Sequence, residues 1–384
     1  MLNDTLSASK SITLVHGGED YFSRLERIIL DAQFEIHIQI YIFDDDFIGN
    51  KIAEALKNAA SRNVKIYLLL DGFGSKSLSE EFIEDFRRHG INVRLFAPLF
   101  SASSFYIGRR LHHKVVVADA KVVLIGGINI ADKYHGTPTV TPWLDYAVQL
   151  NNEQIAAPLQ ELCLDIYYKK RQIRRKKIES VFYTTEEIHV SILQNDWLKK
   201  KNEINNAYIK SIRNSKKEII IVGSYFLPGR KLIGALKKAS QNKVTIKLIL
   251  SGISDVPLLR GASLHFYSKI LRYNIEIYEW DKSVMHGKAA VIDSHWTTIG
   301  SFNLNNLSSY GSIEMNVEIN SATFSKTYLS HLNQIISQCQ RVTSESLITE
   351  QHYFSKFLNW LCYWLIRIIT VVLTYLPYKR FMRL

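Results

Sequence analysis

A pattern of polar and small residues occurs twice in the chain with identical internal spacing. The first copy consists of His112, Lys114, Asp119, Gly126, Gly127 and Asn129, and the second of His286, Lys288, Asp293, Gly300, Ser301 and Asn303. A lone His-x-Lys occurs by chance in many proteins, whereas a duplicated pattern in which every interval agrees is specific. We therefore expect the two copies to share one chemical task.

Histidine, lysine and amide side chains together suit the cleavage and transfer of a phosphodiester. An imidazole can act as nucleophile or as acid and base, while ammonium and amide groups stabilise charge that develops on phosphate oxygens. Facing one another, the copies would offer two of each group to one small site. We predict that His112, Lys114, His286 and Lys288 are catalytic and that Asn129, Asn303, Gly127 and Ser301 bind phosphate.

The motif aspartates are expected to work differently from the histidines. Alternate residues of a strand share a face, so each motif histidine projects with its lysine, whereas Asp119 and Asp293 have the opposite parity. We count both aspartates with the catalytic set but expect structural or second-shell roles for them.

Two further carboxylates are candidates for orienting the histidines. Asp145 and Glu314 follow the motif histidine of their own half by 33 and 28 residues. Either could be the buried carboxylate that orients an imidazole, or a plain surface carboxylate. The remaining histidines near the motifs are expected to be structural, namely His113, His135 and His295.

The elements around the pattern also repeat. Their hydrophobic spacing predicts a strand over 34–43, a helix over 48–62, a strand over 64–70, a helix over 80–89 and a strand over 91–96. The first three recur at 218–226, 231–240 and 244–250. Such alternation is typical of βαβ units and a largely parallel sheet.

We predict an α/β protein of two similar α/β/α domains that pack together with the active site between them, followed by a C-terminal membrane-associated helix. The predicted boundaries are 1–168 for the first domain, 169–180 for a basic linker, 181–345 for the second domain and 346–384 for the C-terminal segment.

The composition excludes several classes of protein. Of the 384 residues 47% are hydrophobic and 22% are charged, which excludes a disordered or collagen-like chain. The formal net charge of +12 favours a polyanionic partner: nucleic acid, an anionic membrane or a phosphorylated substrate. The three cysteines are far apart, so we expect neither a disulfide framework nor a zinc site, and a reducing compartment fits. The polar first ten residues do not indicate a signal peptide.

The duplicated pattern resembles the HKD motif of the phospholipase D superfamily. Residues 111–120, 125–129 and 144–148 are similar to bacterial cardiolipin synthases, especially those of the B type, and the resemblance covers most of the chain. It implies a double displacement without metal or cofactor, in which one histidine attacks phosphorus and forms a phosphatidyl-histidine. The other histidine protonates the departing alcohol and then deprotonates the acceptor hydroxyl. By this resemblance His112 is the nucleophile and His286 the acid and base. The chain departs from the family at Asn305 and Ser312, where Asp and Asn are common.

Residues 357–376 form an apolar stretch that is just long enough to span a bilayer, with Arg367 in its middle. On a helix, its polar and amphipathic residues at 359, 363, 367, 370 and 374 share an arc of about 80°. This pattern favours a helix in the membrane interface with Trp360, Trp364 and Arg367 as contact residues. The basic block 169–177 and the basic tail residues Lys379, Arg380 and Arg383 would attract anionic lipid. A true span, and a helix docked on the protein or on a second copy, are the alternatives.

Together, these observations predict a cardiolipin synthase bound peripherally to the cytoplasmic side of the inner membrane. It would transfer a phosphatidyl group from phosphatidylglycerol or phosphatidylethanolamine to phosphatidylglycerol. Its partners would be an anionic phospholipid membrane and phospholipid substrates, with no nucleic acid. Hydrolysis of phospholipids to phosphatidic acid is the alternative within this chemistry, and cleavage of nucleic acid is the alternative of another class. The donor lipid and the oligomeric state stay open.

Overall fold

The structure is a computed structural model that describes residues 11–98, 100–101, 104–105, 109–169, 177–183, 187–196, 199–305, 311–349 and 353–375. Packing divides the chain into two compact units. Unit 1 comprises Met1–Leu193, Ile299–Ser301 and Ile313–Ser321, and unit 2 comprises Gln194–Thr298, Phe302–Ser312 and Ala322–Leu384. Most of the predicted basic block, the first ten residues and the basic tail residues lie outside the described residues.

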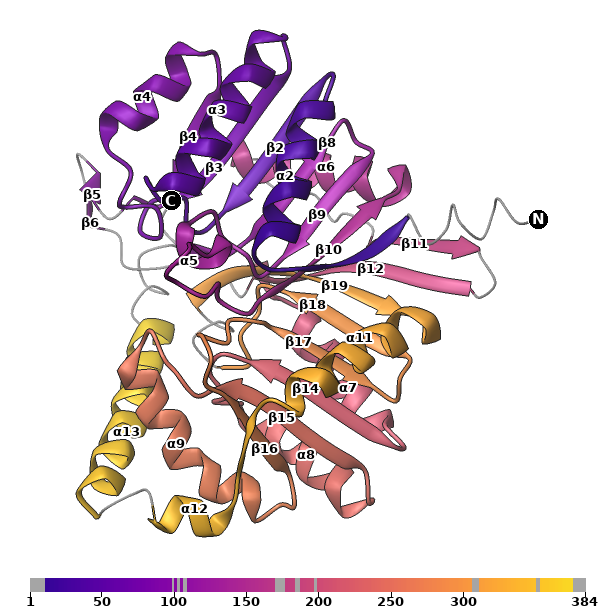
Figure 1. Cartoon of the computed structure of the whole chain (residues 1–384), viewed down its shortest axis with the longest axis vertical. Helices are drawn as coiled ribbons and strands as arrows, with labels where there is room; N and C mark the ends of the chain where they lie inside the picture. The colour runs from indigo at the N-terminus through magenta and orange to yellow at the C-terminus, as the bar shows by residue number, and fades with distance from the viewer. Residues whose placement is uncertain are drawn as a thin grey trace. The chain divides into compact units, whose positions relative to one another are not determined.

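Unit 1 is built on a mixed seven-stranded sheet (Figure 1). Its strands, in order across the sheet, are β1 (Ile12–His16), β10 (Tyr146–Asn151), β9 (Val122–Gly126), β8 (Lys114–Ala118), β2 (Glu35–Ile40), β3 (Lys65–Asp71) and β4 (Asn92–Phe96). Strands β2, β3 and β4 are parallel, as the βαβ pattern predicts, but β8, β9, β10 and β1 pair antiparallel. The expectation of a largely parallel sheet was wrong, because the tight turn between β8 and β9 permits only an antiparallel pair.

Helices cover both faces of this sheet. Strand β2 is buried on both sides: Ile36, Ile38 and Ile40 join the core formed with α2 (Glu19–Asp31) and α3 (Phe47–Ser61). On the other face, Gln39 donates a hydrogen bond to the Cys163 carbonyl of α6 (Glu153–Tyr167) at 2.9 Å. Unit 1 therefore has the predicted α/β/α layers. Its other helices and strands are α4 (Glu80–Arg88), α5 (Asp132–His135), β5 (Phe100–Ser101), β6 (Ser104–Phe105), β7 (Arg110–Leu111) and β11 (Ile178–Tyr183), together with most of β12 (Glu187–Asp196) and β19 (Ser312–Asn320).

Unit 2 repeats the central part of unit 1. Strands β14 (Glu218–Gly223), β15 (Thr245–Ser251) and β16 (Glu276–Trp280) are parallel, and β17 (Ala289–Ile292) pairs antiparallel with β14, as β8 does with β2. The predicted repeat of strand, helix and strand is confirmed, with α8 (Arg230–Gln241) as the helix. The remaining elements are β13 (Lys201–Asn202), most of β18 (Trp296–Gly300), β20 (Gln340–Val342), α7 (Glu203–Asn214), α9 (Pro257–Leu271), α11 (Ala322–Ile336), α12 (Ser344–Thr349) and α13 (Tyr353–Tyr375).

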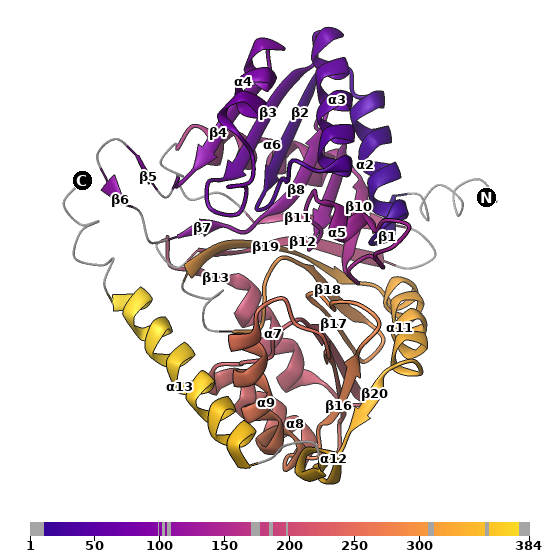
Figure 2. The ribbon, with the colours of Figure 1, turned by 60° about the vertical axis from the view of Figure 1, so that its left-hand side comes forward.

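Helix α13 packs lengthwise against α9 (Figure 2). At their contact, a Cβ on Gly261 of α9 would lie only 3.0 Å from the Cys362 sulfur and 3.1 Å from the Asn359 side-chain oxygen. The Tyr363 ring stacks on Phe266 with centroids 6.4 Å apart. The polar stripe of this segment thus includes residues that face the protein, as the alternative of a helix docked on the protein predicts. No helix among the described residues is long and apolar enough to cross a membrane.

The motif aspartates build the turns of both motif hairpins. Asp119 and Ala120 have φ values of 52° and 53°, and Asp293 and Ser294 have the same pair of values. Two successive residues with positive φ form the tight turn that suits the twist of a hairpin, and aspartate tolerates this conformation better than most residues. Each hairpin can therefore return directly from the motif strand to the next strand.

The same aspartates tie each hairpin to the start of the neighbouring strand. The Asp119 carboxylate accepts hydrogen bonds from the backbone amides of residues 33, 34 and 35, each at 2.8 Å. The Asp293 carboxylate does the same for residues 216, 217 and 218 at 2.7, 2.8 and 3.0 Å. These contacts agree with the structural role expected from parity, and we assign neither aspartate to the reacting atoms.

Replacing either motif aspartate should destabilise the protein. Asp119→Ala and Asp293→Ala each leave three backbone amides without their carboxylate acceptor and put alanine into a left-handed conformation. We expect a loss of about 2 kcal/mol in the free energy of unfolding, measured by urea denaturation. Asp31→Ala removes an exposed aspartate and should change stability little. Equal stability of all three variants would contradict the structural role of the motif aspartates.

Candidate active site

In unit 1 the motif histidine lies just before its strand. His112 and His113 follow β7 and precede β8, and Lys114 is the first residue of β8. His112 therefore lies outside the strand, and strand alternation does not set its position relative to Lys114. The buried Lys114 instead turns back, and its Nζ donates a hydrogen bond to the His112 carbonyl at 2.9 Å.

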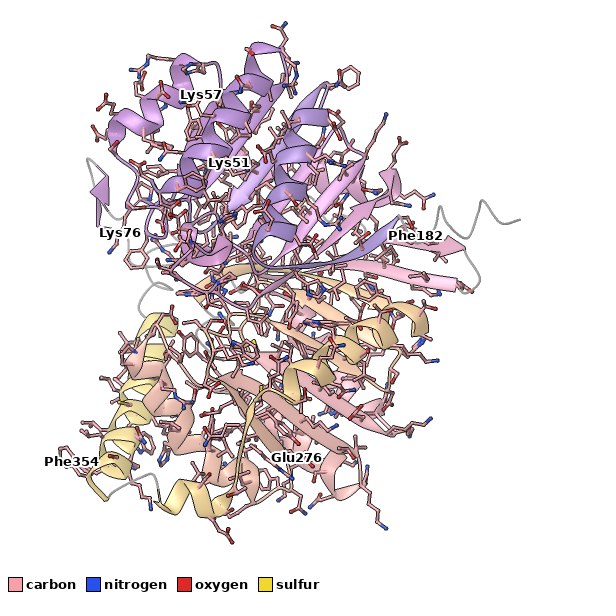
Figure 3. All side chains as sticks on the ribbon, viewed as in Figure 1. Lys51, Lys57, Lys76, Phe182, Glu276 and Phe354 are labelled. Carbon is pink, nitrogen blue, oxygen red and sulfur yellow. The ribbon has the colours of Figure 1, made fainter. Side chains whose placement is uncertain are left out.

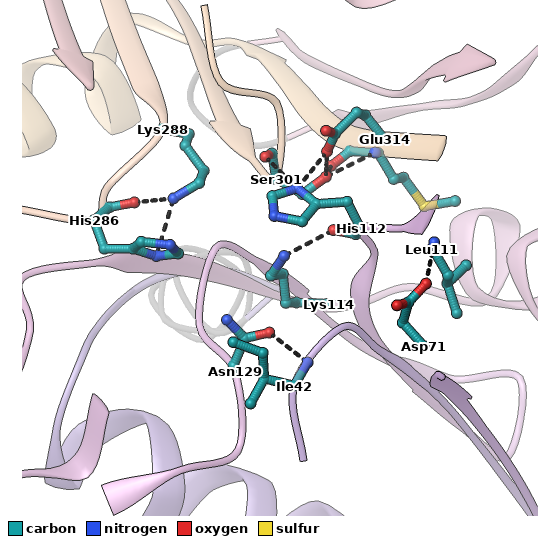
Figure 4. A network of polar contacts seen from close by, with 11 residues as sticks. Ile42, Asp71, Leu111, His112, Lys114, Asn129, His286, Lys288, Ser301 and Glu314 are labelled. Carbon is teal, nitrogen blue, oxygen red and sulfur yellow. Dashed lines mark hydrogen bonds and ion pairs between the residues drawn. The ribbon is translucent and has the colours of Figure 1, made fainter. Parts of the chain in front are cut away.

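Glu314 holds the imidazole of His112. Its Oε2 lies 2.8 Å from His112 Nδ1, and the Ser301 carbonyl oxygen lies 3.1 Å from the same nitrogen (Figure 4). Both neighbours accept hydrogen bonds, so Nδ1 carries the hydrogen and the lone pair is on Nε2. Glu314 is fully buried. The prediction that it orients a histidine is supported, but its partner in the structure is the histidine of the first motif copy.

Ser301 positions this carboxylate. Its hydroxyl donates to Glu314 Oε2 at 2.6 Å and accepts from the Met315 amide at 3.0 Å. Because the hydroxyl is already engaged in this way, we assign Ser301 to positioning Glu314 rather than to binding phosphate. Ser301 and Glu314 belong with unit 1, although Ser301 is part of the second motif copy and Glu314 follows that copy closely in sequence.

Gly127 occupies the repeat position of Ser301, and Asp145 lies against it. A Cβ on Gly127 would be only 2.3 Å from Asp145 Oδ1, so the missing side chain makes room for this carboxylate. We had expected the glycine to admit a ligand. Asp145 is fully buried, which excludes the alternative of a surface carboxylate. The two motif copies thus place a carboxylate at matching points, Asp145 at Gly127 and Glu314 at Ser301.

The two motif asparagines have different surroundings. Asn129 is buried, accepts a hydrogen bond from the Ile42 amide at 3.0 Å and donates one to the Tyr134 hydroxyl at 2.7 Å. These bonds indicate a structural role that links the end of β9 to the segment after β2. Asn303 is half-buried, and its side-chain oxygen has no hydrogen-bond partner among the described residues. Only Asn303 keeps the predicted phosphate-binding role in our account.

The residue before each motif histidine is anchored in the same way. In unit 1 the buried Asp71 at the end of β3 accepts a hydrogen bond from the Leu111 amide at 2.8 Å. In unit 2 the Ser251 hydroxyl at the end of β15 accepts one from the Met285 amide, also at 2.8 Å. Neither anchor is among the predicted site residues, although Asp-Gly and Ser-Gly pairs end these strands in the sequence.

In unit 2 the motif lysine contacts its own histidine. Lys288 Nζ lies 2.9 Å from His286 Nδ1 and also donates to the His286 carbonyl oxygen (Figure 4). Lys288 is buried, as Lys114 is in unit 1. His112 Nδ1 therefore faces a carboxylate and His286 Nδ1 faces an ammonium group. An ammonium group can only donate, so this contact favours a hydrogen on Nε2 of His286.

His112 and the adjacent His113 have different surroundings. Burial, followed by the charge of Lys114, lowers the pKa of His113 to about 3, so His113 is neutral and structural as predicted.

The Tyr41 ring lies edge-on to His112, with centroids 4.9 Å apart. Burial and the charge of Asp71 raise the pKa of Tyr41 far above its usual value, so its hydroxyl stays protonated. Tyr41 is not among the predicted site residues, although a tyrosine occurs at the matching point of the second repeat, Tyr225.

The described residues include no cluster of three or more His, Cys, Asp or Glu side chains arranged to hold a metal ion. The chemistry that these residues can provide is nucleophilic attack by an imidazole, proton transfer by a second imidazole and stabilisation of anionic oxygens by buried lysines.

Comparisons with known proteins agree with this chemistry. The family model "Cardiolipin synthase, PLD-like domain" matches residues 25–162 and 208–336. Cardiolipin synthase B of Escherichia coli K12 is 31% identical over 373 residues, which covers 95% of this chain and 90% of that protein. The minor cardiolipin synthase of Bacillus subtilis is 28% identical over 348 residues, covering 87% of this chain and 83% of the relative.

Among solved structures, phosphatidylserine synthase of Haemophilus influenzae has the same fold. It superimposes with a TM-score of 0.75 at 14% identity, and 95% of each chain is covered. Polyphosphate kinase of Porphyromonas gingivalis gives a TM-score of 0.62 at 17% identity, covering 89% of this chain and 50% of the kinase chain. The matches of the family model and the curated relatives extend over both copies of the duplicated motif. The chain therefore belongs to the family of cardiolipin synthases with phospholipase D-like domains.

Proposed function

We propose that this protein is a phosphatidyltransferase that makes cardiolipin, and that both motif copies serve one active site. The observation that carries the proposal is the hydrogen bond from His112 Nδ1 to Glu314, which leaves the Nε2 lone pair available as a nucleophile. The family relationship supports the substrate class, since the curated relatives are cardiolipin synthases.

The first displacement would form a covalent intermediate. Nε2 of His112 attacks the phosphorus of phosphatidylglycerol, the bond from phosphorus to the glycerol headgroup oxygen breaks, and His286 gives its proton to the departing glycerol. Phosphatidylethanolamine would release ethanolamine by the same step. To act as this acid, His286 would be an imidazolium with hydrogens on both ring nitrogens, so its Nδ1 would exchange the Lys288 ammonium for an acceptor.

The second displacement would complete the transfer. His286 accepts the proton of a glycerol hydroxyl on a second phosphatidylglycerol, the hydroxyl oxygen attacks phosphorus, and the bond between phosphorus and His112 breaks. Two molecules of phosphatidylglycerol thus give one cardiolipin and one glycerol. We propose that Lys114, Lys288 and Asn303 stabilise the phosphate oxygens, and that Asp145 orients His286 as Glu314 orients His112.

A product assay tests this function. Purified protein with phosphatidylglycerol vesicles and a chelator should form cardiolipin and glycerol, as identified by mass spectrometry. His112→Ala and His286→Ala should each lower turnover by at least about 10⁴-fold. His295→Ala, which removes an exposed histidine near the second motif, should retain normal turnover. Phosphatidic acid as the product would change the assignment to a phospholipase, and substantial turnover in either motif variant would contradict the mechanism with two histidines.

Glu314→Gln should separate orientation from folding. A glutamine side chain can either donate to Nδ1 or accept from it, so it no longer fixes the hydrogen on Nδ1. We therefore expect kcat to fall about 10²- to 10⁴-fold with little change in KM. The ¹⁵N shifts of His112 should report the lost preference for the Nδ1 hydrogen. Glu318→Gln on the same strand is the matched control. A Glu314→Gln enzyme with normal kcat would show that this carboxylate has no orienting role.

We further propose that α13 contacts the membrane, peripherally and on the cytoplasmic side. The face of α13 opposite α9 exposes large apolar side chains, including Trp360 and Trp364, and Figure 3 shows Phe354 pointing outward at its beginning. Arg367 stacks over the rings of Tyr363 and Trp364, with its guanidinium carbon 5.8 and 5.6 Å from their centroids. An apolar face edged by a cation suits the boundary of an anionic bilayer.

Charges placed on this face should release the protein from membranes. Leu361 and Ile368 are 48% and 57% exposed, so Leu361→Glu/Ile368→Glu should leave the fold intact while placing two carboxylates among lipid chains. We expect binding to vesicles that contain phosphatidylglycerol to fall by roughly tenfold or more in a flotation assay. The control is Leu30→Glu/Phe47→Glu, which alters two exposed apolar residues of unit 1. The membrane role would be refuted by equal binding of the two variants.

A further inference from the structure

A small cavity lies within unit 2, where α8, α9 and α13 meet. Its volume is about 260 Å³. The lining residues come from the start of α8 and the segment before it, from α9, from the segment after the second motif and from α13; the ones that matter here are Arg230, Lys269, Arg367, Phe266, Tyr363 and Asn305. None of the motif residues is among the described residues that line it, so this cavity is additional to the candidate active site.

The polar side of the cavity is cationic. Arg230, Lys269 and Arg367 come from three different helices, and no acidic side chain is among the described lining residues. Within the part of the chain that the structure describes, none of the three forms an ion pair with a carboxylate. Arg367 instead donates to the Tyr363 hydroxyl at 3.2 Å, and the Lys269 ammonium lies 5.5 Å from the Phe266 ring centroid. Three cationic residues that line one cavity without a carboxylate partner among the described residues favour an anionic ligand.

The other side of the cavity is apolar and continues onto an apolar surface. Leu259 and Phe266 of α9, with Tyr363 and Ile366 of α13, form this wall. The exposed face of α13 beside it carries Trp364 and Ile368. A ligand that fits both parts has a compact anionic group and an apolar body. The cavity is too small for acyl chains, but these could leave it along the apolar face of α13.

We propose that this cavity binds the phosphodiester of an anionic phospholipid in the membrane, as a second lipid site beside the one at the motif histidines. Arg230, Lys269 and Arg367 surround the phosphate oxygens, and the Asn305 side chain adds a polar contact for the headgroup. The proposal rests on the proposed contact of α13 with the membrane. It does not require that the protein transfers phosphatidyl groups.

The test compares two double variants with the same loss of charge. Arg230→Gln/Lys269→Gln removes two cations of the cavity, and Lys231→Gln/Lys238→Gln removes two exposed lysines of α8 that do not line it. Binding of the full chain is measured by flotation with phosphatidylcholine vesicles, with and without phosphatidylglycerol. The preference for phosphatidylglycerol is the ratio of binding to vesicles with and without this lipid. We expect this ratio to fall roughly tenfold more in the cavity variant than in the control. Equal losses would overturn the proposal, because general attraction to the surface predicts them.

A second arm distinguishes a lipid phosphate from free phosphate. Inorganic phosphate, at an ionic strength matched with sodium chloride, is added to the lipid-free protein and thermal unfolding is followed. A Tm increase that only the cavity variant loses, together with equal vesicle binding of both variants, would assign the site to free phosphate and overturn the lipid assignment. Turnover is not a readout in either arm. Failure of the proposed transferase function would therefore appear in the product assay alone, and failure of the lipid site would appear here alone.

Discussion

The hydrogen bond between His112 and Glu314 is the contact on which the proposed chemistry depends. It joins residues 202 positions apart, and the surrounding fold serves to hold the two groups in register. The backbone of the motif segment is anchored on both sides: the His112 amide donates to the Ile313 carbonyl at 3.0 Å, and the Leu111 amide donates to Asp71. A buried carboxylate that accepts from Nδ1 determines which nitrogen of the imidazole is available to react.

The duplication explains why the two motif copies look alike and yet differ in detail. Both copies use aspartate in the hairpin turn, and both have a polar group at the end of the neighbouring strand that binds the residue before the histidine. At the position after the second strand, one copy has Gly127 against Asp145 and the other has Ser301 bonded to Glu314. The repeated parts form the scaffold, and the copies differ in the residue that lies against the carboxylate.

Much of the scaffold could be predicted from the sequence, because strand and helix periods and motif spacing are local properties. The partner of Glu314 could not, since it depends on which strands become neighbours, and hydrophobic patterns do not encode strand order. The same limit applies to α13. Its period showed a polar stripe, but only the packing of Asn359 and Tyr363 on α9 shows that this stripe meets the protein while the apolar face is left exposed. The hydrogen bonds of Asn129 and Ser301 to nearby protein atoms depend on tertiary packing in the same way.

Chemical identification of the covalent intermediate would show which imidazole nitrogen attacks phosphorus. Protein that is turning over phosphatidylglycerol labelled at phosphorus would be quenched in alkali, in which bonds from phosphorus to histidine survive, and the labelled peptide would be sequenced and its isomer assigned. We expect the label on Nε2 of His112, because Glu314 occupies Nδ1. A label on His286, or on Nδ1 of His112, would contradict it.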